Sequence, residues 1–485
     1  MKEKKVLAID IGNDEGKIVL GKFDGEKITL SEVHRFSNEP VTLCNNTHWD
    51  ILKIFQEVKQ GLVKVGGDFD SLGIDTWGAD YGLIDKYGKL ISNPFHYNDT
   101  RTNGMIEKAN RFITPENFYA ITGIQTMNIN TAFQLMAEEE KRPYVLENTK
   151  TLLMIPDLIA YLLTGTKNIE YSIASTTQLL DCMDKKWSAK LLSTLGIRRN
   201  IFPEIIHAGT KKGVILPEIC EELGILSADV LAVCEHNTQS AIVAVPAKEK
   251  DFIFINCGTW SILGTELENP IINNISSSFN VTNGGGFGGT TTFLKNTMGL
   301  WLIQETKRCI ELTGHNISYS DIENLARNSE PFQCFINPNV PEFIPAGNIP
   351  KRVCEYCEKT GQYIPKHIGE VIRCIYESLA FAYRKAFEEI RQCTGKEYSY
   401  IYMFGDGTKD KFLCQLISDA CGIPVKVCCS KSAIVGNVAV QLISYGEIPD
   451  IAHARKIIAD SFPIEIFKPQ EHLDSQYKKF LNISD

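Results

Sequence analysis

KVLAIDIGNDEGKIVLG, Lys5 to Gly21, reads as an apolar strand, a polar turn that contains glycine, and a second apolar strand. DFIFINCGTWSILGTEL, Asp251 to Leu267, repeats this design midway along the chain. The two stretches share little identity, so the repeat is weak, but it predicts two related α/β domains. PAKEKD, Pro246 to Asp251, is the expected boundary, which divides the chain into residues 1–246 and 247–485.

Further strand and helix patterns follow each of the two repeated stretches. KITLSEVHRF (Lys27 to Phe36) and SLGIDTWG (Ser71 to Gly78) are typical of strands, and helices are predicted over Asp50 to Val65 and His367 to Gln392. YSYIYMFGDGTKDKFLCQLISDACGIPV (Tyr398 to Val425) predicts a strand, a glycine turn, a helix, a glycine cap and a strand. The glycine turns of the two domains would face each other across a cleft and hold phosphates through backbone N–H groups.

The composition is that of a soluble globular protein of 485 residues, 44% of them hydrophobic and 22% charged. A net charge of −9 argues against nucleic acid and anionic membranes as partners. The apolar run of MKEKKVLAIDIG is broken at Asp10, too early for a signal peptide, and no run approaches the ~20 residues of a membrane span. We therefore expect a cytoplasmic protein whose 15 cysteines are mostly reduced thiols. The sequence does not indicate its oligomeric state.

Four side chains of metal-binding type fall close together in the sequence, Cys354, Cys357, His367 and Cys374. His367 and Cys374 are seven residues apart on a predicted helix, so they share a face. A Cys3His zinc site is one interpretation, although the spacing matches no compact zinc motif. Unpaired structural cysteines are the other interpretation, and the sequence leaves both open.

CEHNTQSA, Cys234 to Ala241, places polar residues between two short apolar runs. Such a break usually marks a site at the end of a strand. Its one acid is Glu235, and its central residue, Asn237, cannot accept a proton. The sequence therefore predicts a binding site here and leaves open which group would act as a base.

Six stretches between Val6 and Tyr445 resemble the FGGY carbohydrate kinases of the actin-like ATPase fold, and among them the rhamnulokinases. They are LGIDTWGAD (Leu72 to Asp80), NDTRTNG (Asn98 to Gly104), STTQLL (Ser175 to Leu180), NCGTWS (Asn256 to Ser261), LKNTMGLWLIQE (Leu294 to Glu305) and DACGIPV (Asp419 to Val425). The resemblance implies an α/β fold of two ribonuclease H-like domains with a cleft between them. The sugar would bind on the N-terminal side of the cleft and ATP on the C-terminal side.

The resemblance also implies a reaction, in which phosphate passes from ATP to the 1-hydroxyl of L-rhamnulose or a similar ketose with Mg²⁺. It places Asp10 at the phosphates and the metal, and Asn237 at the position of the catalytic base. The residues expected on the sugar are Gly78, Trp77, His236, Asn237, Thr238 and Asn296. Those expected on the nucleotide are Asn13, Asp14, Glu15, Gly16, Lys17, Thr259, Gln304, Gly405, Asp406 and Gly407.

Structural roles compete with these functional ones. Trp77 would equally serve core packing, Asp75 would cap or form a turn, and Asn296 would cap a helix over Thr297 to Glu305. The resemblance favours the functional role at Gly78, His236, Thr238, Thr259 and Asn296.

The sequence departs from the family's pattern where the chemistry is expected. The resemblance implies that Asn237 stands where these kinases have the aspartate that accepts the proton of the attacking hydroxyl, and we expect loss of that aspartate to lower the rate by a factor on the order of 10²–10⁴. Glu15-Gly16-Lys17 replaces Ser-Gly-Arg in the first phosphate turn, and Asp406 replaces a glycine in the second. Asp14, Glu15 and Asp406 would each repel a triphosphate by roughly a few kcal/mol in a partly buried site.

Three functions are compatible with these features. The first is a working rhamnulokinase-like sugar kinase, with Glu235 as a substitute base if it shares a strand face with Asn237. The second is a catalytically impaired pseudokinase that binds a sugar as a sensor or regulator. The third, an actin-like interaction protein without either ligand, is least favoured because the sugar-side motifs IDTWG and NDTRTNG are intact.

Overall fold

The computed structural model describes residues 3–484, which form two compact units. The first unit comprises Met1–Lys248, Glu266–Phe293 and Lys431–Phe462, and the second comprises Glu249–Thr265, Leu294–Ser430 and Pro463–Asp485. Met1, Lys2 and Asp485, which the expected domains include, lie outside the described residues. The functional division at residue 246 stays a prediction, because these units are defined by packing alone.

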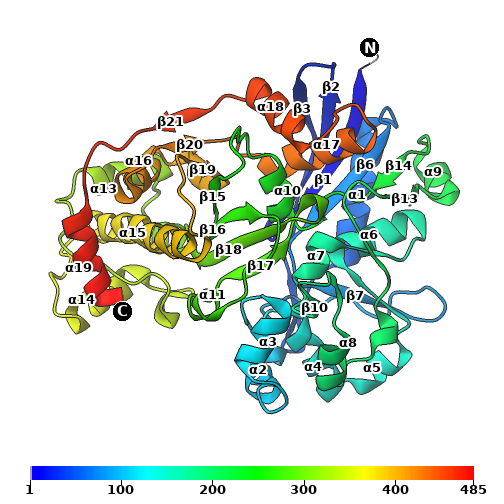
Figure 1. The fold of residues 1–485 in the computed structure, drawn as a ribbon, viewed down its shortest axis with the longest axis horizontal. Coiled ribbons are helices and arrows are strands. Elements are labelled where there is room, and N and C mark those ends of the chain that lie inside the picture. Colours follow the sequence, from blue (N-terminus) through cyan, green and yellow to red (C-terminus); the bar gives the residue numbers. More distant parts are fainter. Residues whose placement is uncertain (1–2, 485) are drawn as a thin grey trace. The chain divides into compact units, whose positions relative to one another are not determined.

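The first unit is built on a six-stranded sheet in the order β13-β14-β6-β1-β2-β3 (Figure 1). β1 is antiparallel to β2 and parallel to β6, β6 is parallel to β14, and β14 is antiparallel to β13. The strands are β1 (Lys4–Ile11), β2 (Glu15–Phe23), β3 (Ile28–Ser37), β6 (Ser71–Thr76), β13 (Lys211–Val214) and β14 (Asp229–Leu231). Every residue of β6 is buried, which is typical of a parallel strand covered on both faces.

The second unit repeats this strand pattern. β15 is antiparallel to β16 and parallel to β19, β19 is parallel to β20, and β20 is antiparallel to β21. The strands are β15 (Ile253–Cys257), β16 (Trp260–Leu267), β19 (Ile401–Phe404), β20 (Val425–Val427) and β21 (Glu465–Phe467). The two hairpins β1–β2 and β15–β16 are the two stretches of similar design, so the predicted repeat of two α/β units is confirmed.

Short strands lie outside these two series. They are β4 (Val41–Leu43), β5 (Asn46–His48), β7 (Tyr81–Ile84), β8 (Thr151–Met154), β9 (Ile169–Glu170), β10 (Leu180–Asp181), β11 (Lys186–Trp187) and β12 (Ile205–Ile206). β17 (Thr282–Gly285) and β18 (Thr291–Met298) instead continue the sheet of the second series beyond β16, in the order β17-β18-β16-β15-β19-β20-β21. β7 pairs with β8 and β9 pairs with β12, and these additions extend the first unit beyond its main sheet.

Helices surround both series of strands. In the first unit they are α1 (Ile51–Val65), α2 (Met105–Ala109), α3 (Pro115–Thr122), α4 (Thr131–Lys141), α5 (Pro143–Asn148), α6 (Ile155–Thr164), α7 (Tyr171–Ser175), α8 (Ala189–Thr194), α9 (Pro217–Leu223), α10 (Asn237–Val243), α11 (Asn274–Ser278), α17 (Ser432–Ser444) and α18 (Ile451–Ser461). In the second they are α12 (Trp301–Glu311), α13 (Tyr319–Arg327), α14 (Ile349–Lys359), α15 (Ile368–Thr394), α16 (Lys411–Cys421) and α19 (Asp474–Ser484).

The ends of the predicted helices follow their capping residues. Asp50 accepts a hydrogen bond from Lys53 N at the start of α1, and Gly66 ends that helix with a φ of 71°. α15, the long yellow helix in Figure 1, ends at Gly395 in the same left-handed conformation. Over residues 3–484, no helix is both long enough and apolar enough to span a bilayer.

α17 comes late in the sequence but packs on the first sheet. Asn437 donates to Gly73 O over 3.1 Å, and Gln441 accepts from Ser71 Oγ over 2.7 Å and donates to Leu7 O over 3.1 Å. These amides satisfy the polar groups on the face of the buried strands. Residues 431–462 therefore belong to the first unit by packing, although the sequence places them near the end of the chain.

Gly436→Ala tests how closely α17 approaches α10. A Cβ at Gly436 would lie 1.7 Å from the backbone oxygen of Ser240, which cannot turn aside. We expect the substitution to lower the free energy of unfolding by about 2–3 kcal/mol, although alanine is the better helix former. Gly61→Ala is the matched control, because its Cβ would first meet the flexible end of Ile18. Equal urea-unfolding midpoints for the two variants would contradict the close approach.

Candidate functional site

Two carboxyl groups meet at the carboxyl ends of the central strands of the first sheet. Asp10 of β1 is in register with Asp75 of β6, so both side chains point to the same face. Burial raises the pKa of Asp10, and burial together with the negative charge of Asp10 raises the pKa of Asp75. Two such carboxyls resist simultaneous ionisation, so the pair retains a proton more readily than isolated aspartates do.

One carboxylate oxygen of Asp75 accepts a hydrogen bond, and the other, called its open oxygen below, does not. Asn437 donates to its Oδ2 over 2.6 Å, while its buried Oδ1 has no hydrogen-bond partner within residues 3–484. The alternative role of Asp75 as a cap or turn residue is wrong, because the residue lies inside β6. An open carboxylate oxygen beside Asp10 is the kind of ligand that a hard cation prefers.

The first predicted phosphate turn joins β1 to β2. Asn13 and Asp14 are exposed, and Gly12 N donates to Glu15 O over 2.8 Å to close the turn. Gly16 lies against the ring of Phe36, where a Cβ would come within 2.1 Å of a ring atom. The small residue at this position is therefore required by packing within the sheet.

The acidic residue of this turn is not an isolated charge. Glu15 pairs with Lys17 at 2.5 Å and with Arg35 of β3 at 2.6 Å. Partial burial acts to raise the pKa of Glu15, but Lys17 and then Arg35 lower it below its ordinary value. The negative charge that Glu15 adds to this turn is therefore partly compensated. Sequence reasoning missed Arg35, whose partnership depends on the pairing of β2 with β3.

The CEHNTQSA stretch follows β14 and ends in a helix. His236 pairs with Thr76 as a parallel bridge at the end of β6, and Thr76 N donates to Glu235 O over 2.8 Å. Asn237 is the first residue of α10, and Thr238 is buried in the same turn. Burial lowers the pKa of His236 to about 4, so its ring is neutral near pH 7. The predicted site at a strand end is thus brought beside the end of β6.

Glu235 does not take the place of the missing base. The premise that it shares a strand face with Asn237 is wrong, because Asn237 begins a helix. The Glu235 carboxylate is buried and pairs with the buried Lys212 at 2.6 Å. Lys212 also pairs with Asp157 at 2.5 Å, and burial, then the charge of Asp157, raises the pKa of Glu235 well above its ordinary value. This side chain is a structural member of a buried charge cluster.

Glu170 connects the same cluster to the backbone of the CEHNTQSA stretch. Its carboxylate accepts from Glu235 N over 3.1 Å and from Ser172 Oγ over 2.5 Å. Ser172 Oγ in turn accepts from His236 N over 3.2 Å. Burial raises the pKa of Glu170 to about 7. Neither Glu170 nor Lys212 has a motif that sequence reasoning could have used, since both act through contacts distant in the chain.

The tryptophan of IDTWG packs in the core of the first unit. Trp77 and Trp49 lie with ring centroids 4.2 Å apart, and both donate from Nε1 to Asp80, over 3.0 and 2.6 Å. Gly78 adjoins Thr176, where a Cβ would come within 2.8 Å of the side chain. The structure thus places Trp77 in packing contacts, with its indole nitrogen hydrogen-bonded inside the protein, and Gly78 directly against the side chain of Thr176.

The NDTRTNG motif also has a structural explanation. Asp99 accepts from Thr47 N over 2.7 Å and caps a turn at Arg101 N over 2.9 Å. The buried Arg101 pairs with the buried Glu138 at 2.7 Å. A buried pair of this kind is costly to break, because the remaining partner keeps an uncompensated charge.

The second unit places its predicted nucleotide residues at two adjacent strand ends. β15 and β19 are parallel, with Asn256 in register with Phe404, so the turns that follow them start side by side. Thr259 donates to Gln304 over 3.1 Å. Gly405 has a φ of 87° and a ψ of −174°, and a Cβ there would lie 2.6 Å from Cys257 O, so only glycine fits.

Asp406, Gly407 and Asn296 occupy different settings. Asp406 is exposed and pairs with Lys409 at 2.7 Å, so its charge is partly compensated. A Cβ at Gly407 would lie 2.2 Å from Cys257 Sγ, so packing requires glycine there. Asn296 lies inside β18, and α12 begins only at Trp301, so its alternative role as a helix cap is wrong.

The predicted cysteine and histidine quartet is not assembled. Cys354 donates to Pro365 O over 3.7 Å, and His367 is exposed and lies 3.3 Å from Glu370. Cys357 and Cys374 instead converge with Cys334, with ligand atoms within 4.8 Å of one another. The C-x-x-C spacing was misleading, because residues three apart on α14 can point to different neighbours.

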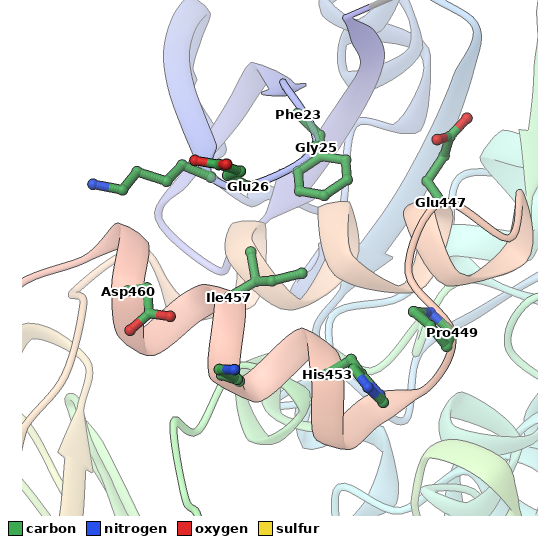
Figure 2. Close-up of a pocket in the computed structure, with 10 residues that line it drawn as sticks. Phe23, Gly25, Glu26, Glu447, Pro449, His453, Ile457 and Asp460 are labelled. Carbon is green, nitrogen blue, oxygen red and sulfur yellow. The ribbon is translucent and has the colours of Figure 1, made fainter. Parts of the chain in front are cut away.

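A surface pocket of the first unit lies between the β2–β3 turn and α18 (Figure 2). Its volume is about 690 Å³, and its lining includes Phe23, Lys27, His453, Ile457 and Asp460. None of the predicted site residues lines this pocket. It therefore plays no part in the candidate site.

Comparisons with known proteins cover nearly the whole chain. The N-terminal domain of the FGGY family of carbohydrate kinases matches residues 5–244, and the C-terminal domain matches residues 253–445. A rhamnulokinase of Bacteroides thetaiotaomicron is 35% identical over 485 residues, with 99% of each chain covered. One of Oceanobacillus iheyensis is 38% identical over 461 residues, with 94% of this chain and 97% of that protein covered.

Solved structures support the fold. A ligand-bound xylulose kinase from Lactobacillus acidophilus matches with a TM-score of 0.82 at 16% identity, covering 99% of this chain and 96% of that one. Glycerol kinase from Plasmodium falciparum, solved with ADP, matches with a TM-score of 0.80 at 15% identity and the same coverage. At such identities the likeness concerns the fold alone.

Glu170→Gln tests the buried charge cluster. The pKa of Glu170 rises from its ordinary 4.5 to about 7, so in that range the folded protein keeps a proton that the unfolded chain releases. The free energy of unfolding therefore falls as the pH rises from about 4.5 to about 7. We expect the free energy of unfolding of Glu170→Gln, measured with urea, to fall over this pH range by up to about 3 kcal/mol less than that of the wild type. Glu204→Gln, which changes an exposed acid, is the control, and wild-type pH dependence in Glu170→Gln would contradict the assignment.

Proposed function

Because the chain belongs to the FGGY family of carbohydrate kinases, we propose that it is an ATP-dependent sugar kinase of the rhamnulokinase type. Its substrate would be L-rhamnulose or a similar ketose, phosphorylated at the 1-hydroxyl. The observation that carries the proposal is the assembly of Asp10, Asp75 and His236 at one edge of the first sheet. This arrangement gathers carboxylates for phosphate and metal chemistry beside the stretch that would contact the sugar.

The sugar would lie against the end of β6 and the start of α10. The sugar would pass close to the half-buried backbone of Gly78, and the neutral ring of His236 offers one donor and one acceptor to sugar hydroxyls. Asn237 is half-buried at the first turn of α10 and presents an amide oxygen and an amide nitrogen. These groups bind and orient a polyol without placing a charge in the sugar pocket.

Asn237 orients the attacking hydroxyl but cannot take its proton. Phosphoryl transfer passes through a loose transition state in which positioning and charge neutralisation dominate, so loss of the base would slow the reaction without abolishing it. We expect slow turnover, lower than that of an aspartate-containing enzyme by a factor on the order of 10²–10⁴. The proton would leave to solvent or to a phosphate oxygen.

The residues at the edge of the first sheet fit a magnesium ion. Asp10 and the open Oδ1 of Asp75 are hard oxygen ligands, which Mg²⁺ prefers. When bound with ATP, Mg²⁺ would neutralise charge on the transferred phosphate. Lys17 lies across from Asp10 in the β1–β2 pairing and keeps a cation close to the same edge. In the second unit, Thr259, Gln304 and the Gly405 turn would hold the nucleotide through hydroxyl, amide and backbone groups.

A second function is favoured by one specific observation, the asparagine at the base position. A protein with this substitution would bind its sugar without efficient transfer and act as a sensor or regulator. Because Glu235 pairs with Lys212, it supplies no replacement base in this structure. The two functions share the sugar site and differ in turnover alone.

Asn237→Asp separates the two functions. In a coupled assay of sugar-dependent ADP release with L-rhamnulose, we expect the aspartate to raise kcat by a factor on the order of 10²–10⁴, because it restores a general base. Asn237→Ala is the matched control, since it removes the amide without adding a carboxylate. Turnover that stays absent in Asn237→Asp would support the binding function if calorimetry still shows L-rhamnulose binding. Absence of both turnover and binding would contradict the sugar-kinase proposal itself.

Glu15→Ser and Asp406→Gly test the acidic phosphate turns. Each carboxylate is already paired, Glu15 with Lys17 and Arg35 and Asp406 with Lys409. We therefore expect each substitution to change the Kd of Mg·ATP, measured by calorimetry, by less than about tenfold. Lys409→Ala, which leaves Asp406 unpaired, should weaken binding instead. A gain of about a hundredfold in either acid-removing variant would show that repulsion dominates these turns.

A further inference from the structure

Three cysteine side chains converge in the second unit, and none has a role in the proposed reaction. Cys334 lies in the loop between α13 and α14, Cys357 on α14 and Cys374 on α15. Their exposed fractions are 3%, 0% and 2%. The three sulfur atoms all lie within 4.8 Å of one another. Three segments that are separate in the sequence thus present their sulfurs to one point.

The loop that carries Cys334 is held in place on both sides. Gln362 accepts from Phe335 N and donates to Phe335 O, both over 2.9 Å. Glu377 accepts from Phe332 N over 2.9 Å, and Ser378 Oγ accepts from Ile336 N over 3.0 Å. A ligand fixed by neighbouring hydrogen bonds pays little ordering entropy when it binds. The sulfur of Cys334 is therefore preorganised toward the two helices.

These three thiols differ in their hydrogen bonding from cysteines such as Cys309 and Cys414. Cys309 and Cys414 donate to backbone carbonyls, over 3.1 and 3.7 Å. Within residues 3–484, no oxygen accepts a hydrogen bond from the sulfur of Cys334, Cys357 or Cys374. The three sulfurs instead face one another.

We propose that Cys334, Cys357 and Cys374 form a three-thiolate site for a soft d¹⁰ cation of the Cu(I) class. Thiolates select soft ions, and a structural zinc site needs four ligands, whereas within residues 3–484 the cluster offers three. Metal–sulfur bonds of about 2.3 Å in a trigonal plane place the sulfurs about 4 Å apart. The observed separations require shifts smaller than about 1 Å to reach that geometry.

Binding of the ion releases protons and involves no oxidation or reduction. Each thiol that joins the ion breaks an S–H bond, forms an S–Cu bond and releases one proton to solvent. Copper enters and stays as Cu(I), so no electron is transferred. Because protons are released, affinity rises with pH until the ligands are deprotonated. The site lies within the second unit and contains none of the residues assigned to the sugar or the nucleotide.

Titration with Cu(I) tests the proposal on the reduced, full-length protein without oxygen. A chromogenic Cu(I) chelator competes for the ion, so weak binding to the remaining thiols is suppressed. We expect one equivalent to bind, with thiolate-to-copper absorption in the near ultraviolet. Cys357→Ser should abolish both signals. Cys354→Ser is the matched control, because it removes a thiol three residues earlier on the same helix that lies outside the cluster.

Three results would overturn the proposal. They are failure of the wild type to compete with the chelator, equal signals from Cys357→Ser and Cys354→Ser, and tighter binding of Zn(II) than of Cu(I). Loss of two hydrogens at a pair of these cysteines in the protein as isolated, seen by mass spectrometry, would show a disulfide and also count against it. If Cys357→Ser fails to fold, Cys334→Ser gives the same comparison, because that residue lies in a loop.

Discussion

The parallel pairing of β1 with β6 is the constraint on which the candidate site depends. Its register sets Asp10 beside Asp75, and the bridge from Thr76 to His236 carries the same edge on to the start of α10. A shift of one residue would turn Asp10 to the opposite face of the sheet. The register is held by buried apolar side chains along both strands and by the amides of α17, which satisfy the polar groups above them. The pairing of β1 with β6 thus sets both the geometry of the candidate site and the packing of the core.

The buried charges behind the CEHNTQSA stretch explain why Glu235 does not replace the missing base. Lys212 balances Asp157 and Glu235 inside the protein, and Glu170 holds the backbone that leads into α10. A carboxylate committed to a buried lysine has little freedom to reach a substrate, and removing it would leave the lysine uncompensated. The asparagine at position 237 therefore changes the chemistry of the site without changing the framework that positions it. In such an arrangement, phosphate transfer can be lost while sugar binding is kept.

Much of the fold could be predicted from the sequence, and part of the site. The β1–β2 and β15–β16 hairpins, α1 and α15 follow from local periodicity and capping residues. The strand-end position of His236 followed from the polar break between two apolar runs. The pairing of Glu15 with Arg35 could not be predicted, because it needs the register of β2 on β3. The cysteine cluster could not be predicted for the same reason: the sequence offered Cys354 and His367 as candidate partners of Cys357 and Cys374, but spacing within α14 does not show which sulfurs face Cys334 in the loop before it.

By itself the sequence determined the elements, the repeated hairpin design, the FGGY resemblance and the asparagine at the base position. Each of these depends on residue identity or on neighbours a few positions away. The tertiary structure alone decided that Asn437 satisfies Asp75, 362 residues earlier, and that Glu235 faces Lys212 instead of the sugar site. It also decided that Cys334 joins Cys357 and Cys374. Such partners are chosen by packing between segments distant in the chain, and no local pattern records that choice.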